Sequence, residues 1–152
     1  WICTSSDRLA PLDTHTSAQA ESSAVASLES SPPMRGATGL QNLGNTCFLN
    51  ATIQCMANTP LLREYFLSSQ YLRDIREQGT SCKGKLAEEF GHVLADLWAG
   101  KKTALTPRSL KRTIDQFAPQ FAGYEQHDAQ ELLAFFLDGL HEDLNRSSIG
   151  SA

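Results

Sequence analysis

The chain has 152 residues, which is enough for one domain with a hydrophobic core. It carries 13 Lys and Arg against 17 Asp and Glu, so it offers no basic field for nucleic acid. No apolar run is long enough to cross a membrane, and the four cysteines and four histidines lack zinc-type spacing, so we expect no membrane anchor, no metal and no cofactor. Widely separated cysteines indicate free thiols in a reducing compartment, the cytoplasm or nucleus.

Composition divides the chain into three parts. Residues 1–35 are rich in Ser and Ala and contain almost no aromatic residues, so they cannot bury enough apolar surface to offset their ordering entropy. We therefore predict a flexible segment over 1–35 and a folded part over 36–146. Residues 147–152 are predicted to form an unstructured tail.

Two helices are predicted in the first half of the folded part. The first runs from Cys47 to about Asn58, and its expected inward residues are Phe48, Leu49, Ala51, Ile53, Cys55 and Met56. The second starts at Thr59-Pro60, a cap residue followed by proline, and its stripe is Leu61, Leu62, Tyr65 and Phe66. The pattern continues weakly through Leu72 and Ile75. Residues 79–84 are predicted to form an exposed loop.

Three more helices are predicted in the second half. The clearest covers 85–99, with a stripe of Leu86, Phe90, Val93, Leu94, Leu97 and Trp98. The next starts at Thr106-Pro107 and ends at Ala118, with Leu110, Ile114 and Phe117 inward. The last starts at the capping box of Asp128 and Glu131 and runs to about Asn145. We place His92 and His141 on helix surfaces.

The stretch from Gly39 to Asn50 carries the chemistry. A loop with two glycines and three side-chain amides leads directly into an apolar helical run that starts at Cys47. Asn45 or Thr46 is a natural N-cap, and the positive end of a helix dipole favours a thiolate in the first turn. Such a cysteine can act as a nucleophile when a histidine lies beside it, although a single cysteine there is also compatible with an ordinary buried residue.

Residues 39–54 resemble the cysteine box of the ubiquitin-specific proteases, thiol hydrolases with a papain-like α+β fold. The resemblance implies that Cys47 is the nucleophile and that Asn42, five residues before it, supplies an oxyanion-hole amide. The fold implied for this chain is mainly α, about five helices of the N-terminal, thumb-like half of the catalytic domain. Ubiquitin and ubiquitinated proteins are the implied partners.

A second block, from Gly123 to Leu133, resembles the Gln/Asp-rich box of the same family. The resemblance places Gln126 beside the substrate cleft and implies that Asp128 helps to hold the basic C-terminal tail of ubiquitin. Carboxylates accept hydrogen bonds from guanidinium groups, so the chemistry agrees with the implied role.

A thiol hydrolase also needs a histidine base and a residue that orients it. In the family both lie far downstream of the second block, and none of His15, His92, His127 and His141 stands in a matching motif. We therefore expect this chain to stop before the catalytic His and Asp or Asn. Alone it would be inactive and marginally stable, because its helices would expose apolar faces.

Three hypotheses follow. The first is the N-terminal half of a cysteine-type deubiquitinase that cleaves the bond after the C-terminal glycine of ubiquitin. The second is an inactive helical module that binds ubiquitin or another partner. The third, a purely structural domain, requires both family-like blocks to be accidental.

Overall fold

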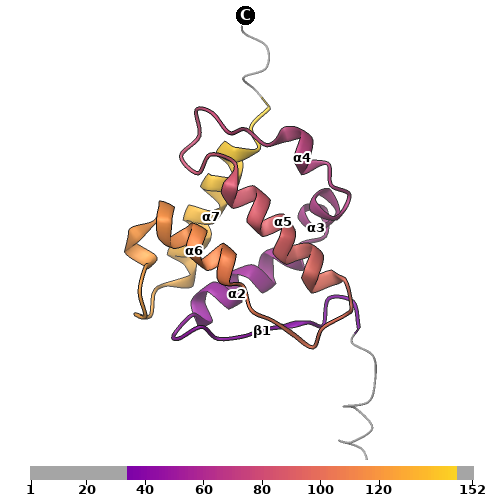
Figure 1. Ribbon diagram of the computed structural model, residues 1–152, viewed down its shortest axis with the longest axis vertical. Helices are drawn as coiled ribbons and strands as arrows, with labels where there is room; N and C mark the ends of the chain where they lie inside the picture. The colour runs from indigo at the N-terminus through magenta and orange to yellow at the C-terminus, as the bar shows by residue number, and fades with distance from the viewer. Residues whose placement is uncertain (1–33, 147–152) are drawn as a thin grey trace, which may run out of the picture. The chain divides into compact units, whose positions relative to one another are not determined.

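The computed structural model describes residues 34–146, and the tail predicted for 147–152 and nearly all of the predicted flexible segment lie outside the described residues. Within 34–146 the chain is mainly α, as predicted (Figure 1). Its elements are β1 (Gly39–Leu40), α2 (Cys47–Ala57), α3 (Pro60–Leu67), α4 (Tyr71–Asp74), α5 (Lys85–Trp98), β2 (Ala104–Leu105), α6 (Arg108–Phe117), the 3-10 helix η1 (Pro119–Phe121) and α7 (Ala129–Asp143).

Helix α5 forms the centre of the fold and packs on α3, α6 and α7 (Figure 1). Its predicted stripe is confirmed, since Leu86, Phe90, Val93, Leu94 and Leu97 are buried. The Phe90 ring contacts Phe66 of α3 at 4.9 Å and Phe136 of α7 at 5.3 Å, both edge to face. One aromatic side chain thus joins three helices.

Helix α2, which begins with Cys47, packs on α7 and α3. Phe48, Leu49, Ile53 and Met56 are buried as predicted. A helix packed along two sides cannot tilt without breaking this core, so the position of its first residue is fixed.

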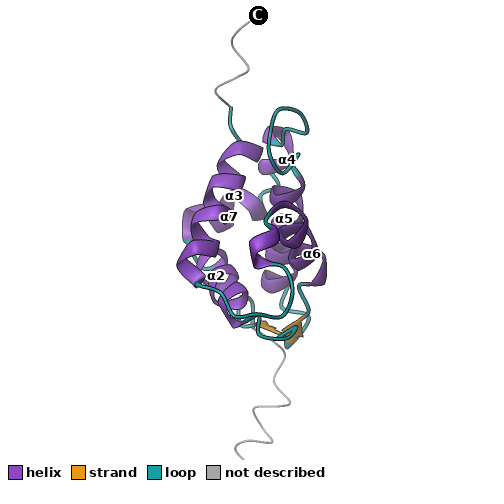
Figure 2. Cartoon of the chain, turned by 90° about the vertical axis from the view of Figure 1, so that its left-hand side faces the viewer, coloured by secondary structure: helices purple, strands orange, loops and turns teal. Residues whose placement is uncertain are grey.

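Two short parallel strands, which the sequence analysis did not predict, lie at one end of the helices (Figure 2). Gly39 pairs with Ala104 and Leu40 with Leu105. The N–H of Gln41 donates to the Leu105 carbonyl at 2.9 Å. Residues 39–41, which precede the loop that leads to Cys47, are therefore held against the connection between α5 and α6.

Several predicted burial positions are wrong. Ala51 and Cys55 are exposed, and Thr52 takes the inward place on α2 instead. Leu61, near the start of α3, is 82% exposed. The buried part of α3 is its C-terminal end, where Phe66 meets α5. The predicted loop over 79–84 is also only partly exposed, since Cys82 is fully buried.

Candidate active site

The loop before α2 is closed by one side chain. The Asn42 Oδ1 accepts hydrogen bonds from the backbone N–H groups of Gly44 and Thr46, both at 3.0 Å, and from the Thr46 hydroxyl at 3.1 Å. Two backbone donors identify this atom as the oxygen, so the other end of the amide is the Nδ2 donor. Among residues 34–146, no acceptor contacts that Nδ2 group.

Thr46 is the N-cap residue of α2, one of the two predicted candidates, but its hydroxyl does not cap the helix. The Thr46 Oγ1 instead accepts from the N–H of Leu43 at 2.9 Å. The Thr46 side chain is buried and tightens the loop rather than the helix start. The N-cap side chain therefore accepts no hydrogen bond from the first N–H groups of α2. These N–H groups remain able to donate to another group.

Cys47 is the first residue of α2 and is exposed, whereas Phe48 and Leu49 directly after it are buried. The core thus anchors the helix while its leading thiol stays accessible. Cys82 is different, because burial raises the pKa of its thiol. Of these two thiols, only Cys47 is exposed.

The two sequence blocks meet in space. The Asn45 Nδ2 donates to the carbonyl of Tyr124 at 2.8 Å, across 79 positions of sequence. Gly44 has a φ of +105°, and a Cβ there would lie 2.9 Å from the Tyr124 ring. A glycine is therefore required at position 44 both for its backbone conformation and for the approach of the second block.

His127 of the second block packs against the cysteine helix. Its ring meets Phe48 edge to face at 5.2 Å and Phe121 at 5.5 Å. The Nε2 atom is buried and has no hydrogen-bond partner within the described residues. The Thr52 Oγ1 also donates to the Ala129 carbonyl at 3.3 Å, so the second turn of α2 lies beside the first residue of α7.

Asp128 is the N-cap of α7, as predicted, and its Oδ1 accepts from the Gln130 N–H at 2.6 Å. The carboxylate remains exposed, and with Gln130, Glu131 and Ala134 it lines a depression of 300 Å³. Gln126 is exposed in the loop that precedes it. The structure therefore places an acidic helix start beside the helix that begins with Cys47.

The other described histidines lie on the surfaces of α5 and α7. His92 on α5 and His141 on α7 are exposed, as predicted, while His15 lies outside the described residues. Within 34–146 there is no cluster of three or more potential metal ligands. No helix of that part is long and apolar enough to span a membrane.

Sequence reasoning missed the contact that joins the two blocks. Asn45 was considered only as an N-cap candidate and Tyr124 was not singled out, although Gly44 and Gly123 stand next to them. Glycine in both loops was the available signal, since Gly44 and Gly123 both adopt positive φ.

A family model for ubiquitin carboxyl-terminal hydrolases matches residues 38–151, which include both blocks. The chain belongs to the ubiquitin carboxyl-terminal hydrolase family. It is 51% identical over 112 residues to ubiquitin carboxyl-terminal hydrolase 15 of Rattus norvegicus, covering 73% of this chain and 12% of that protein. It is 54% identical over 113 residues to putative ubiquitin carboxyl-terminal hydrolase 11 of Arabidopsis thaliana, covering 74% and 13%. The chain thus spans about an eighth of the length of these relatives.

Among solved structures, the chain resembles one in the SAGA Ubp8/Sgf11/Sus1/Sgf73 DUB module bound to ubiquitin aldehyde. The TM-score is 0.59 at 19% identity, covering 88% of this chain and 32% of that one. At this identity the likeness establishes the fold. The helices described above therefore share the fold of about a third of that chain.

Proposed function

We propose that this chain is the nucleophile-bearing part of a cysteine-type deubiquitinase. The Cys47 thiolate would attack the carbonyl carbon of the bond after the C-terminal glycine of ubiquitin. The amine of the acceptor would leave with a proton, and water would then hydrolyse the thioester. Such an enzyme would act in a reducing compartment, the cytoplasm or nucleus, where the thiol stays free.

The contact between the two blocks carries the proposal. The hydrogen bond from Asn45 to Tyr124 and the His127–Phe48 contact hold the start of α7 beside the start of α2. An exposed thiol and an exposed acidic helix start are then neighbours. A substrate with a cationic tail and a terminal carbonyl could engage both at once.

Asn42 is suited to stabilise the oxyanion of the tetrahedral intermediate. Its Oδ1 is held by three donors, so the orientation of the amide is set before substrate binds. The Nδ2 end then serves as a preorganised donor, and such a donor is worth about a hundredfold to a thousandfold in rate.

Asp128 and Gln126 would hold the basic tail of ubiquitin. One Asp128 oxygen caps α7 through Gln130, which fixes the carboxylate without neutralising it. The second oxygen can accept from a guanidinium group. Gln126, exposed two residues earlier, adds an amide next to this carboxylate.

The general base would come from outside these 152 residues. His92 and His141 lie exposed on α5 and α7, and the Nε2 of His127 is covered between aromatic rings. A histidine with an orienting Asp or Asn, contributed by a longer product of the same gene, would complete the site.

The test compares this chain with a longer product of its gene, using a ubiquitin C-terminal amide that fluoresces on cleavage. We expect turnover by the longer product, loss of that turnover in Cys47→Ala, and no turnover by the 152-residue chain. Cys55→Ala, a change at the other exposed cysteine of α2, is the control and should leave turnover intact. If the short chain cleaves the substrate and Cys47→Ala abolishes that cleavage, the base lies within it and the proposal of a missing base is wrong.

A second candidate is a module that binds ubiquitin without cleaving it. The absence of an accessible histidine next to Cys47 among the described residues favours it. It predicts that the chain alone binds ubiquitin in a calorimetric titration and that Asp128→Ala weakens this binding. A chain that shows no binding, combined with a longer product that cleaves, would reject this candidate.

A further inference from the structure

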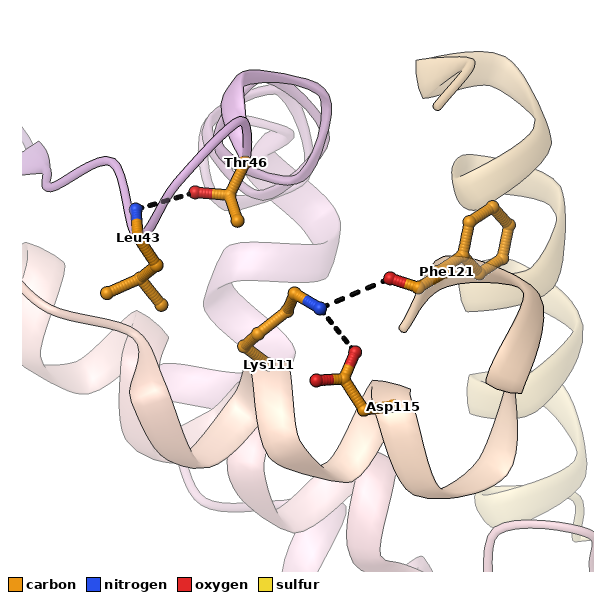
Figure 3. A network of polar contacts seen from close by, with 5 residues as sticks. All are labelled: Leu43, Thr46, Lys111, Asp115 and Phe121. Carbon is orange, nitrogen blue, oxygen red and sulfur yellow. Dashed lines mark hydrogen bonds and ion pairs between the residues drawn. The ribbon is translucent and has the colours of Figure 1, made fainter. Parts of the chain in front are cut away.

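A cationic pocket lies beside the loop that precedes Cys47. The proposed cleavage does not use this pocket. It has a volume of 360 Å³ and is lined by Leu43 and Thr46 of that loop, by α6 and by Gly123 and Tyr124. Figure 3 shows Leu43 and Thr46 across from Lys111 of α6. Thr46 directly precedes Cys47 in the sequence, although Cys47 itself does not line the pocket.

The charges of the pocket come from one face of α6. Arg108, Lys111, Arg112 and Asp115 line it, which gives three cations against one carboxylate. Lys111 is buried and is already used, because its Nζ forms an ion pair with Asp115 and donates to the Phe121 carbonyl at 3.2 Å (Figure 3). This pair neutralises itself and leaves the two arginines as the net charge of the pocket.

Arg108 and Arg112 are exposed and stand one helical turn apart. Within residues 34–146 neither guanidinium group has an ion-pair or hydrogen-bond partner. Side chains at i and i+4 lie about 5–6 Å apart at their Cβ atoms, so the two groups can bind neighbouring oxyanions. The chain as a whole carries a net charge of −4, so this local excess of cations is not a general property of its surface.

The size and walls of the pocket indicate which anion it takes. A volume of 360 Å³ lies at the low end of the range for ligand pockets, about 300–1,000 Å³, and suits one or two side chains. Leu43 and the Tyr124 ring offer apolar surface for aliphatic stems, which inorganic phosphate lacks.

We propose that this pocket binds the carboxylate side chains of an acidic peptide segment, with Arg108 and Arg112 as the recognising groups. The binding goes beyond the proposed cleavage, since it needs neither Cys47 nor a histidine base. Its effect would be to seat an acidic stretch of a partner polypeptide beside the cysteine loop.

The experiment is a calorimetric titration of the whole chain with a blocked peptide of consecutive glutamates and with the matching glutamine peptide. We expect binding of the first peptide only, weakening as ionic strength rises from about 0.01 M to about 0.15 M. The double variant Arg108→Gln/Arg112→Gln should lose about tenfold or more in affinity, because two charge-assisted hydrogen bonds are removed.

The matched control is Lys83→Gln/Lys85→Gln. It removes the same charge from a different pocket, whose lining includes Glu77 and Glu88 as well as these lysines, and it should leave the affinity unchanged. Equal binding of the glutamate and glutamine peptides, or equal loss in both double variants, would overturn the proposal. Inorganic phosphate that binds as tightly as the glutamate peptide would also overturn it, since the pocket would then be a simple anion site. None of these outcomes depends on whether the chain or a longer product cleaves ubiquitin.

Discussion

At the scale of single residues, the two ends of the Asn42 amide have separable roles. Replacement by Ala removes the acceptor of three donors, so we expect the free energy of unfolding of the chain to fall by about 1–3 kcal/mol. Asn42→Asp keeps the acceptor but replaces the Nδ2 donor by a second carboxylate oxygen, which adds a negative charge. We therefore expect the Asp variant to unfold near the wild-type urea midpoint, but to lower kcat of the longer product about a hundredfold or more.

The comparison of the two variants decides the role of the donor. Stability is measured on this chain by urea unfolding, and kcat on the longer product with the fluorogenic ubiquitin amide. Full activity in a folded Asn42→Asp variant would contradict an oxyanion role and leave Asn42 as a loop-closing residue alone.

Residue roles that depend on local sequence could be predicted, and those that depend on a distant partner could not. The cap at Asp128 follows from the helical run after it, whereas the sequence left open whether Cys47 is buried, and only the packing of α2 leaves it exposed. The burial of Cys82 could not be read from its glycine-flanked loop, because α5 and α7 create that site. The family roles of Cys47, Asn42, Gln126 and Asp128 came from the resemblance and stay proposals.

At the scale of elements, α5 is capped by a residue of another helix. Asp143, the last residue of α7, is fully buried and accepts from the N–H groups of Gly84 at 2.9 Å and Ala87 at 3.2 Å. Removing this carboxylate leaves buried donors unsatisfied at the positive end of the central helix. We expect Asp143→Ala to lower the free energy of unfolding by about 3 kcal/mol in urea titrations.

Asp143→Asn retains one acceptor oxygen and should lose less stability than the Ala variant. Asp138→Ala, at an exposed position of the same helix, is the control and should change the free energy of unfolding by less than about 0.5 kcal/mol. Equal small losses in all three variants would show that the buried carboxylate contributes nothing to the joining of α5 and α7.

A second link joins α3, α4 and the end of α7. The Tyr65 hydroxyl donates to the Asp74 carboxylate at 2.6 Å, and Arg146 contacts the same oxygen at 2.6 Å. The hydrogen bond from Tyr65, and then Arg146, lower the pKa of Asp74 below its ordinary value. Because the folded pKa is the lower one, the stabilisation is complete above about pH 5 and is lost as pH falls through that folded pKa.

We therefore expect Asp74→Asn to make the chain less sensitive to acid. The measurement is the urea midpoint at about pH 7 and about pH 3, where the wild-type protein should lose more stability than the variant. Tyr65→Phe should likewise reduce the loss of stability between about pH 7 and about pH 3. A wild-type protein and an Asp74→Asn variant that lose equal stability would contradict the role of this link.

Helices with strong periodicity were predicted to within one or two residues, and shorter elements were not. Helix α5 was predicted over 85–99 and is found over Lys85–Trp98. The strands β1 and β2 have two residues each and η1 has three, too few to show a period. Their pairing partners lie far along the chain, so only the assembled helices bring them together.

At the scale of the whole molecule, apolar side chains remain at the surface of a helical unit that spans about an eighth of its relatives' length. Leu137 is 48% exposed on α7, whose buried side packs on α2 and α5, and Leu61 is 82% exposed on α3. In a longer hydrolase, further residues could cover such positions. In this chain they are available for contact between copies.

We expect the isolated chain to self-associate as its concentration rises, measured by sedimentation velocity. Leu137→Glu should shift this association to higher concentration while changing the free energy of unfolding by less than about 1 kcal/mol, because the side chain is already half exposed. Leu61→Glu tests an exposed leucine on a different element, so a shift in Leu137→Glu alone would assign the contact to α7. A chain that sediments as a monomer at every concentration would show that its exposed leucines do not drive self-association. The expectation of a half-domain with apolar faces that require a partner would then be wrong.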